Sequence, residues 1–167
     1  MLKAGNMIPE ADLGRLGAGG TVETVPILDH LKQYDMAILV GMPGSFTPVC
    51  SSKHLPSIIA SKACLFRSGV ESINILTPDN PWSMQAWADS IPGADGLMFL
   101  SDGNREFLRH SGMSDCVEAF YLGRGYKRFL AVLNRGFVTR IAVETSILEV
   151  TCTDGEAAVS MAKALAH

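Results

Sequence analysis

The sequence predicts an α/β fold, a mixed central β-sheet flanked by helices, formed by one domain over residues 1–167. Three observations support this prediction. Short apolar runs typical of buried strands alternate with helical segments, and a hairpin signal follows them. The length of 167 residues also matches one domain with a full hydrophobic core.

Each expected element follows from its local residue pattern. Continuous apolar runs predict buried strands, at residues 36–40, 73–76 and 97–100. A further pair of strands is joined by a three-residue loop that ends in Gly136, and comprises residues 128–133 and 137–144. Residues 1–26 are expected as loop and short extended pieces. Helices are expected at residues 27–33, 47–67, 81–89, 104–110 and 157–166.

Composition and charge exclude several classes of protein. The chain has 14 Lys and Arg against 17 Asp and Glu, so it lacks the basic excess that neutralises nucleic-acid phosphates. No apolar run approaches the ~18 residues of a membrane span, and no secretory signal is visible. Four cysteines are too few for a disulfide scaffold. We therefore expect a cytoplasmic protein, with a processed organelle form as the alternative.

The segment from Gly41 to Pro56 puts a cysteine at the start of a helix. Thr47 is a suitable N-cap, because its hydroxyl can accept from a free backbone N–H, and Pro48 suits the first helical position. Cys50 then falls in the first turn, where free N–H groups and the helix dipole favour a thiolate. We expect Pro56 to kink the helix further on. The site also follows the carboxyl end of a central strand, where α/β sheets bind ligands.

The residues alone leave two interpretations of Cys50 open, a reactive thiolate or a small buried hydrophobic residue. The spacing Pro-x-x-x-Thr-x-x-Cys, formed by Pro43, Thr47 and Cys50, resembles the active-site signature of the peroxiredoxins. The string GMPGSFTPVCSSKHLP is similar to the type II, five-like subfamily, redoxins of the atypical two-cysteine type. Weaker similarities keep the order and spacing of that subfamily, at residues 79–87, 101–107 and 127–129.

This resemblance implies a thioredoxin-like fold and a thiol-dependent peroxidase that needs no metal, flavin or haem. The substrates would be hydrogen peroxide and alkyl hydroperoxides, with peroxynitrite as a further candidate. Cys50 would be the peroxidatic nucleophile and become a sulfenic acid. Thr47 and Arg128 would stabilise charge on the departing oxygen, and Pro43 would limit water around the thiolate. From the residues alone, a charged surface residue is the simpler interpretation of Arg128, because several basic residues lie nearby in the sequence.

The remaining chemistry-bearing residues near Cys50 have open roles. His54, four residues later, could be a supporting base or a polar helix position, and the pair is weak evidence for a metal site. A cysteine hydrolase would need a Cys–His pair oriented by a third group. Cys64 is expected in the core, roughly 21 Å along the same helix, which exceeds the reach of a disulfide. Cys116 is expected in a loop without a role.

Cys152 resembles the resolving cysteine of the atypical two-cysteine members, which form an intramolecular disulfide after local unfolding. Plant-like type II members carry that cysteine on the strand matched here by residues 73–76. This sequence has Ile75 there, so the plant-like route is closed. Alternatively, Cys152 is idle and the Cys50 sulfenic acid is reduced directly by a small or protein thiol.

The expected reductant is thioredoxin, glutaredoxin or glutathione. Type II members associate as weak homodimers through loops around the active site. Phe46, Trp82 and Tyr121 are candidate contacts for such a dimer, although ordinary core packing explains any one of them more simply. An alternative function for the same oxidisable thiol is a redox sensor or holdase that acts by binding partners. Slow recycling after one oxidation would distinguish the sensor from the peroxidase.

Overall fold

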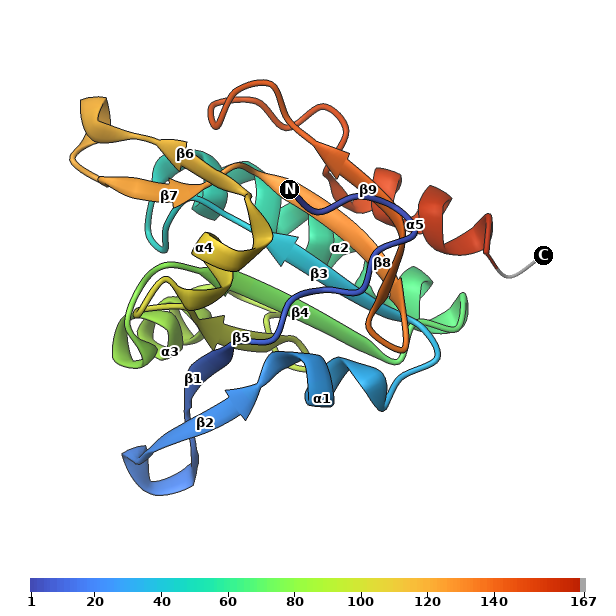
Figure 1. Ribbon diagram of the computed structural model, residues 1–167, viewed down its shortest axis with the longest axis horizontal. Helices are drawn as coiled ribbons and strands as arrows, with labels where there is room; N and C mark the ends of the chain where they lie inside the picture. Colours follow the sequence, from blue (N-terminus) through green and yellow to red (C-terminus); the bar gives the residue numbers. More distant parts are fainter. Residues whose placement is uncertain (166–167) are drawn as a thin grey trace.

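The computed structural model describes residues 1–165 and has a central sheet with helices on both faces (Figure 1). The strands of the sheet are β1 (Asp12–Leu16), β2 (Val22–Pro26), β3 (Ala37–Gly41), β4 (Ser72–Thr77), β5 (Met98–Ser101), β8 (Phe129–Asn134) and β9 (Phe137–Val143). A separate two-stranded ribbon consists of β6 (Ser114–Cys116) and β7 (Arg124–Tyr126). The helices are η1 (Ala18–Gly20), α1 (Ile27–Lys32), η2 (Cys50–His54), α2 (Leu55–Arg67), α3 (Pro81–Ser90), α4 (Glu106–Ser111), η3 (Glu118–Phe120) and α5 (Gly155–Lys163).

Within residues 1–165, the strands of the sheet run in the order β2-β1-β5-β4-β3-β8-β9. β3, β4 and β5 are parallel to one another, and the outer pairings on both sides are antiparallel. This mixed sheet flanked by helices confirms the predicted fold class. None of the helices in the described part of the chain combines the length and apolar character needed to cross a membrane.

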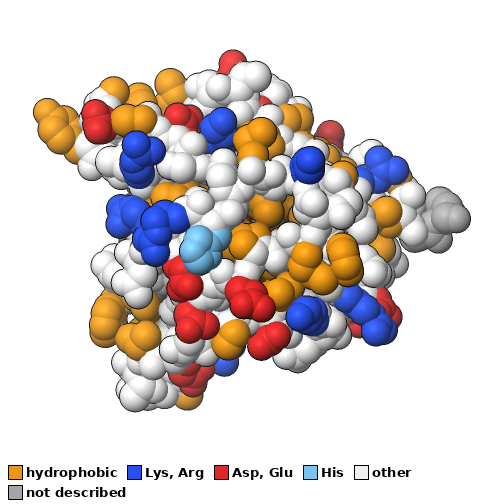
Figure 2. Space-filling model, in the orientation of Figure 1, with side chains coloured by type: hydrophobic (Ala, Val, Ile, Leu, Met, Phe, Trp, Pro, Cys, Tyr) orange, Lys and Arg blue, Asp and Glu red, His pale blue; other side chains and the backbone are white. Residues whose placement is uncertain are grey.

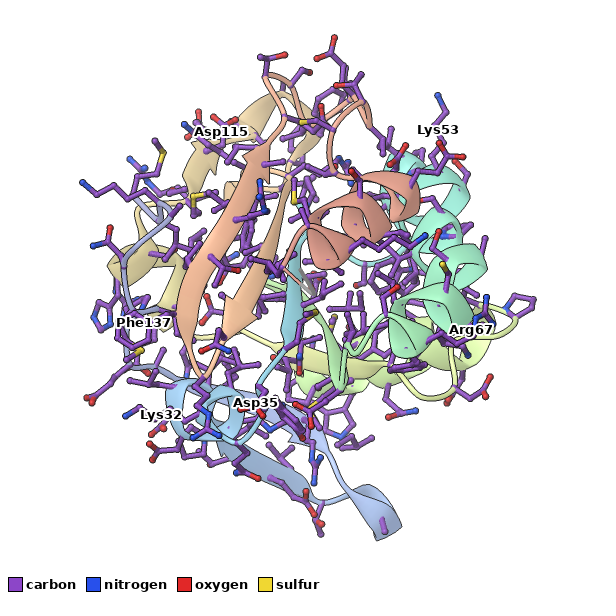
Figure 3. The ribbon with its side chains drawn as sticks, turned by 90° about the vertical axis from the view of Figure 1, so that its right-hand side faces the viewer. Lys32, Asp35, Lys53, Arg67, Asp115 and Phe137 are labelled. Atoms are coloured by element: carbon purple, nitrogen blue, oxygen red, sulfur yellow. The ribbon has the colours of Figure 1, made fainter. Side chains whose placement is uncertain are left out.

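The central strand β3 divides the core into two layers. All five of its residues are buried, as the continuous apolar run predicted. Ala37 and Leu39 pack with α1 and α4 on one face, whereas Ile38 and Val40 pack with α2, α3 and α5 on the other. Figure 3 shows α5 beside α2 and the β8–β9 strands. The end of β3 therefore delivers the chain into the layer formed by α2, α3 and α5.

The N-terminal segment contains more regular structure than the sequence indicated. β1 and β2 form an antiparallel hairpin at one edge of the sheet. Their polar and charged residues hide the alternation that identifies a strand. Gly14 on β1 pairs with Ser101, and a Cβ at this position would lie 2.9 Å from the Pro81 ring. Glycine is therefore needed where the hairpin meets α3.

Helix ends differ from the expected positions by a few residues. The helix expected from residue 104 begins at Glu106, because Arg105 has a left-handed φ of 56°. The last helix begins at Gly155, where the side chain of Asp154 accepts from the Ala157 N–H (2.8 Å). Its expected end at residue 166 lies outside the described residues.

Candidate active site

Cys50 lies in η2, a turn of π-helix between the loop after β3 and α2. The Ser51 N–H donates to the Thr47 carbonyl (3.0 Å), which starts the helix near the expected position. The Leu55 N–H then donates to the Cys50 carbonyl, at the longer spacing of a π-turn. Pro56 follows directly and has no N–H to continue the α-helical pattern. The kink expected from Pro56 thus takes the form of a π-turn that ends just before it.

The π-turn buries the side chains of two residues that lie four positions apart in the sequence. Cys50 and His54 are both 0% exposed. The intervening Lys53 points away from the molecule (Figure 3). His54 is therefore a buried polar position in the helix.

Arg128 reaches this pair from the end of the chain segment that leads into β8. Its side chain is buried (1% exposed). Nη1 donates to the Cys50 sulfur (3.4 Å) and to His54 Nδ1 (3.0 Å), and Nη2 donates to the Ile147 carbonyl (2.5 Å). Three partners thus fix the guanidinium, and Arg128 is not the charged surface residue that the sequence left possible. Nε has no partner among the described residues.

His54 is held in one neutral form by its two partners. Nε2 lies 2.7 Å from the Thr153 carbonyl, which can only accept. Nε2 therefore carries the proton, and Nδ1 accepts from Arg128. Burial, and then the charge of Arg128, lower the pKa of His54 from 6.5 to about 4. Both ring nitrogens are engaged, so His54 in this arrangement is no base for Cys50.

Glu144 closes the polar network behind His54. Its carboxylate accepts hydrogen bonds from the backbone or hydroxyl groups of Thr151, Cys152 and Thr153. Burial raises the pKa of Glu144, but these hydrogen bonds outweigh it and bring the pKa to about 2. The carboxylate is therefore ionised at neutral pH. It fixes the loop that supplies the Thr153 carbonyl.

Thr47 does not cap the helix as expected. Its hydroxyl donates to the Gly44 carbonyl (2.7 Å) instead of accepting from a first-turn N–H. Phe46 has a left-handed φ of 58°, a tight turn that brings the Thr47 side chain back to Gly44. The hydroxyl oxygen retains lone pairs for another partner.

A pocket of about 460 Å³ adjoins this cluster at Arg128, whereas the buried Cys50 and His54 do not line it. Thr47 and Arg128 line it together with Pro43. Its other walls come from Pro48, Val49 and two segments distant in the sequence, residues 119–122 and 147–148, and are mostly apolar. The structure thus brings together Pro43, Thr47, Cys50, Arg128 and His54.

The other cysteines lie apart from this cluster, and the four thiols are free. The half-buried Cys152 donates weakly from its sulfur to the Val143 carbonyl (3.7 Å). Burial, and then the charge of Glu144, raise the pKa of Cys152. Cys64 is half-buried rather than in the core, about 100° around α2 from the buried Leu65.

Cys116 is exposed in β6 rather than in a loop. Its position in the ribbon follows from its pairing with Arg124 of β7. Nothing in its surroundings gives it a role.

Comparison with known proteins identifies the family. The redoxin family model matches residues 3–159. The chain belongs to the redoxin family. It is 31% identical over 147 residues to peroxiredoxin-2E-2, a chloroplastic protein of Oryza sativa subsp. japonica, covering 86% of this chain and 65% of that relative. The chain therefore spans slightly less than two thirds of that protein.

Two further matches cover more of the related proteins. The chain is 29% identical over 144 residues to peroxiredoxin-2B of Arabidopsis thaliana, covering 86% of this chain and 88% of the relative. The crystal structure of reduced Prx3 from Vibrio vulnificus, in complex with hydrogen peroxide, superposes with a TM-score of 0.89. It is 26% identical and covers 97% of this chain and 99% of that one. The expected type II, five-like peroxiredoxin, its thioredoxin-like fold and its class as a thiol-dependent peroxidase are confirmed.

Three groups of this redoxin site were not found from the sequence. Glu144, the Thr153 carbonyl and the Ile147 carbonyl lie 16 to 25 residues beyond Arg128 in the chain. Two of them are backbone groups, which carry no residue signal. A lone glutamate after a strand has no local pattern that distinguishes it from a solvent-exposed charge.

Proposed function

We propose that Cys50 is the peroxidatic cysteine of this peroxidase and that Arg128 is its main electrostatic partner. The observation that carries the proposal is the 3.4 Å contact between Arg128 Nη1 and the Cys50 sulfur, in a buried site. A fixed positive charge at this distance favours the thiolate over the thiol. Among the described residues, none of the other three cysteines accepts a hydrogen bond from a cationic side chain at its sulfur.

In the proposed reaction the Cys50 thiolate attacks one oxygen of the peroxide. A sulfur–oxygen bond forms as the oxygen–oxygen bond breaks, so the sulfur is oxidised by two electrons and the peroxide is reduced. The departing oxygen takes up a proton and leaves as water or an alcohol. Donors aimed at that oxygen lower the barrier. The Arg128 Nε–H has no partner among the described residues and is a suitable donor. The Thr47 hydroxyl donates to the Gly44 carbonyl, so it can accept a hydrogen bond from the peroxide O–H at the pocket.

The pocket supports a range of peroxides. Its volume of about 460 Å³ exceeds what hydrogen peroxide needs, and its apolar walls suit an alkyl chain. The Vibrio relative was crystallised with hydrogen peroxide, which supports the smaller substrate too. Pro43 forms part of the wall and would limit water around the sulfur. Peroxynitrite remains a further candidate substrate.

For the second half of the cycle, we propose Cys152 as the resolving cysteine. The plant-like position on β4 is occupied by the buried Ile75, which leaves Cys152 as the thiol whose loop contacts the Cys50 network, through Thr153. Its loop would have to unfold locally for a Cys50–Cys152 disulfide to form. Thioredoxin, glutaredoxin or glutathione would then reduce the oxidised enzyme. Direct reduction of the sulfenic acid by glutathione or glutaredoxin is the competing route.

Association and location belong to the same proposal. Phe46, Trp82 and Tyr121 are not core residues, as the simpler interpretation held, because they are 56%, 59% and 99% exposed. Phe46 and Tyr121 adopt left-handed backbone turns that direct them outward. Figure 2 shows hydrophobic side chains at the projecting end of the β6–β7 ribbon, which carries η3. These exposed groups support a weak homodimer.

The location of the protein in the cell is a separate part of the proposal. Relatives are chloroplastic and mitochondrial; we propose a cytoplasmic location here.

Mass mapping of the cysteines after one equivalent of peroxide tests this proposal. The expected product is oxidation at Cys50, as a sulfenic acid or as a disulfide with Cys152. Oxidation that begins at Cys64 or Cys116 would contradict the assignment of Cys50. Failure of the protein to consume hydrogen peroxide or organic hydroperoxides with excess dithiol would contradict the peroxidase as a whole.

A further inference from the structure

We propose that Glu144 is a positioning residue for the peroxidase reaction, which holds the Arg128 guanidinium against Cys50 through Thr153 and His54. Glu144 has no hydrogen bond to the Cys50 sulfur and does not line the pocket, so its effect on the reaction must act through other residues. The inference rests on the proposed roles of Cys50 and Arg128. It assigns a function to a buried carboxylate that the reaction itself does not use.

The first step is the loop clamp. Glu144 Oε1 accepts from the backbone N–H groups of Thr151 (2.7 Å), Cys152 (2.8 Å) and Thr153 (3.1 Å), and from the Thr153 hydroxyl (2.9 Å). Oε2 accepts from the Thr151 hydroxyl (2.8 Å). Three successive amides that converge on one oxygen fix the backbone of the loop. The Glu144 N–H donates to the Arg128 carbonyl (3.0 Å), so the clamp is anchored beside Arg128 itself.

The second step is the transfer of position from the loop to the arginine. With the loop fixed, the Thr153 carbonyl holds His54 Nε2–H at 2.7 Å. That bond leaves His54 Nδ1 free to accept from Arg128 Nη1 (3.0 Å). Arg128 Nη1 also donates to the Cys50 sulfur (3.4 Å). Every bond in this chain has one possible direction of donation, because the carbonyl only accepts and the guanidinium only donates. A displaced loop would therefore release the histidine and then the arginine.

The chemistry explains why such a support is useful. An arginine side chain loses rotamer entropy when it is fixed. Transition-state stabilisation requires donors that are already in place when charge develops on the departing oxygen. Besides His54, the Arg128 guanidinium donates to the Cys50 sulfur and to the Ile147 carbonyl, so loss of His54 would leave Nη1 with the sulfur alone.

The charge of Glu144 argues for positioning rather than direct electrostatics. A carboxylate near a thiolate disfavours the second negative charge. The benefit of Glu144 to the reaction must therefore come from the geometry that its hydrogen bonds impose. A glutamine can accept the same four bonds at its amide oxygen and donate to the Thr151 hydroxyl. Glu144→Gln should hence preserve the reaction, whereas Glu144→Ala should impair it.

The experiment measures the single-turnover rate of Cys50 oxidation by hydrogen peroxide, beside its rate of alkylation by iodoacetamide. Tryptophan fluorescence can follow the first rate, because Trp87 Nε1 donates to the Ser51 hydroxyl next to Cys50 (3.0 Å). Glu144→Ala should slow oxidation about tenfold or more, somewhat less than the loss of a transition-state donor itself. Alkylation needs no donor on a departing oxygen and should change less. Glu144→Gln and the control Glu149→Ala, an exposed acid on the same segment, should retain the wild-type rate.

A double-mutant cycle tests the proposed path through Arg128. In an Arg128→Met background, Glu144→Ala should cause little further loss, because the two residues act as one unit. Three results would each overturn the inference. Glu144→Ala could slow oxidation equally in both backgrounds, or it could leave the rate unaffected, or Glu144→Gln could be as slow as Glu144→Ala. If Glu144→Ala does not fold, Glu144→Asp decides: its shorter carboxylate should cause the same selective loss, and a wild-type oxidation rate would overturn the inference. Turnover that survives in Cys50→Ser would instead contradict the proposed function.

Discussion

The charged groups beside Cys50 and Cys152 have opposite signs, although one hydrogen-bonded network links the two regions. Cys50 is fully buried beside the guanidinium of Arg128. Cys152 is half-buried beside the carboxylate of Glu144, and burial together with that charge raises the pKa of its thiol. A cation favours the reactive thiolate, whereas an anion opposes it. The difference indicates that the two cysteines are prepared for separate steps.

His54 joins the two regions, because its ring bonds to Arg128 on one side and to the Thr153 carbonyl on the other. Movement of the Cys152 loop toward Cys50 would break the His54–Thr153 bond and the hydrogen bonds to Glu144. The peroxide step would therefore require this loop in place, and a resolving step by Cys152 would require it to leave. This makes the contrast between the cysteines open to test.

The largest effect is expected from exchanging the cysteines one at a time. Cys50→Ser should reduce peroxide consumption to background, because a hydroxyl in this site is not ionised. Cys152→Ser should leave the first oxidation of Cys50 intact and change the preferred reductant. Steady-state assays with thioredoxin, glutaredoxin and glutathione, each beside a stopped-flow measurement of Cys50 oxidation, would check both. Unchanged thioredoxin-supported turnover in Cys152→Ser would remove Cys152 from the mechanism.

The next largest effect is expected from a change to Arg128, the cation beside Cys50. Arg128→Lys keeps a positive charge but cannot reach the Cys50 sulfur, His54 and the Ile147 carbonyl together. Oxidation of Cys50 should slow by about 10²–10³-fold, the usual effect of losing a transition-state donor. The exposed Arg124→Lys on β7 is the matched control. A rate near wild type in Arg128→Lys would show that charge alone suffices.

The sequence could identify the Cys50 side of this contrast because its determinants are local. Pro43, Thr47, Cys50 and Pro56 lie within one short segment, so their spacing predicts a strand, a loop and a helix with the cysteine in its first turn. The Cys152 side depends on Glu144 and on backbone carbonyls, whose partners are set only when the segment between β9 and α5 packs against η2 and α2. The Thr47 hydroxyl shows the limit even locally, because the turn at Phe46 redirects it to Gly44.

A third effect is the pH dependence of stability that His54, the residue linking the two regions, should produce. The pKa of His54 falls from 6.5 to about 4 on folding, so the unfolded chain binds a proton more readily between these values. The contribution of neutral His54 to stability is complete above pH 6.5 and is lost as the pH falls to 4. The loss is on the order of 3 kcal/mol. Denaturant unfolding across this range should show a smaller pH dependence in His54→Gln, and an equal dependence would contradict a neutral, bonded histidine.

The smallest effect concerns the anion on the Cys152 side. Glu144→Gln removes the second cause of the raised Cys152 pKa and leaves the first, burial, in place. The thiolate fraction of Cys152 at neutral pH should then rise, and its alkylation should become about two- to fivefold faster. Mass mapping of alkylated peptides over time distinguishes Cys152 from the other three thiols.

Glu149→Gln provides the control for this last measurement, because Glu149 is an exposed acid on the same segment whose charge is screened by solvent. Its Cys152 should react at the wild-type rate. Equal alkylation rates in Glu144→Gln and wild type would mean that burial alone restrains Cys152. The two cysteines would then differ in the cation beside Cys50 and not in the anion beside Cys152, and release of the loop would be enough to make Cys152 reactive.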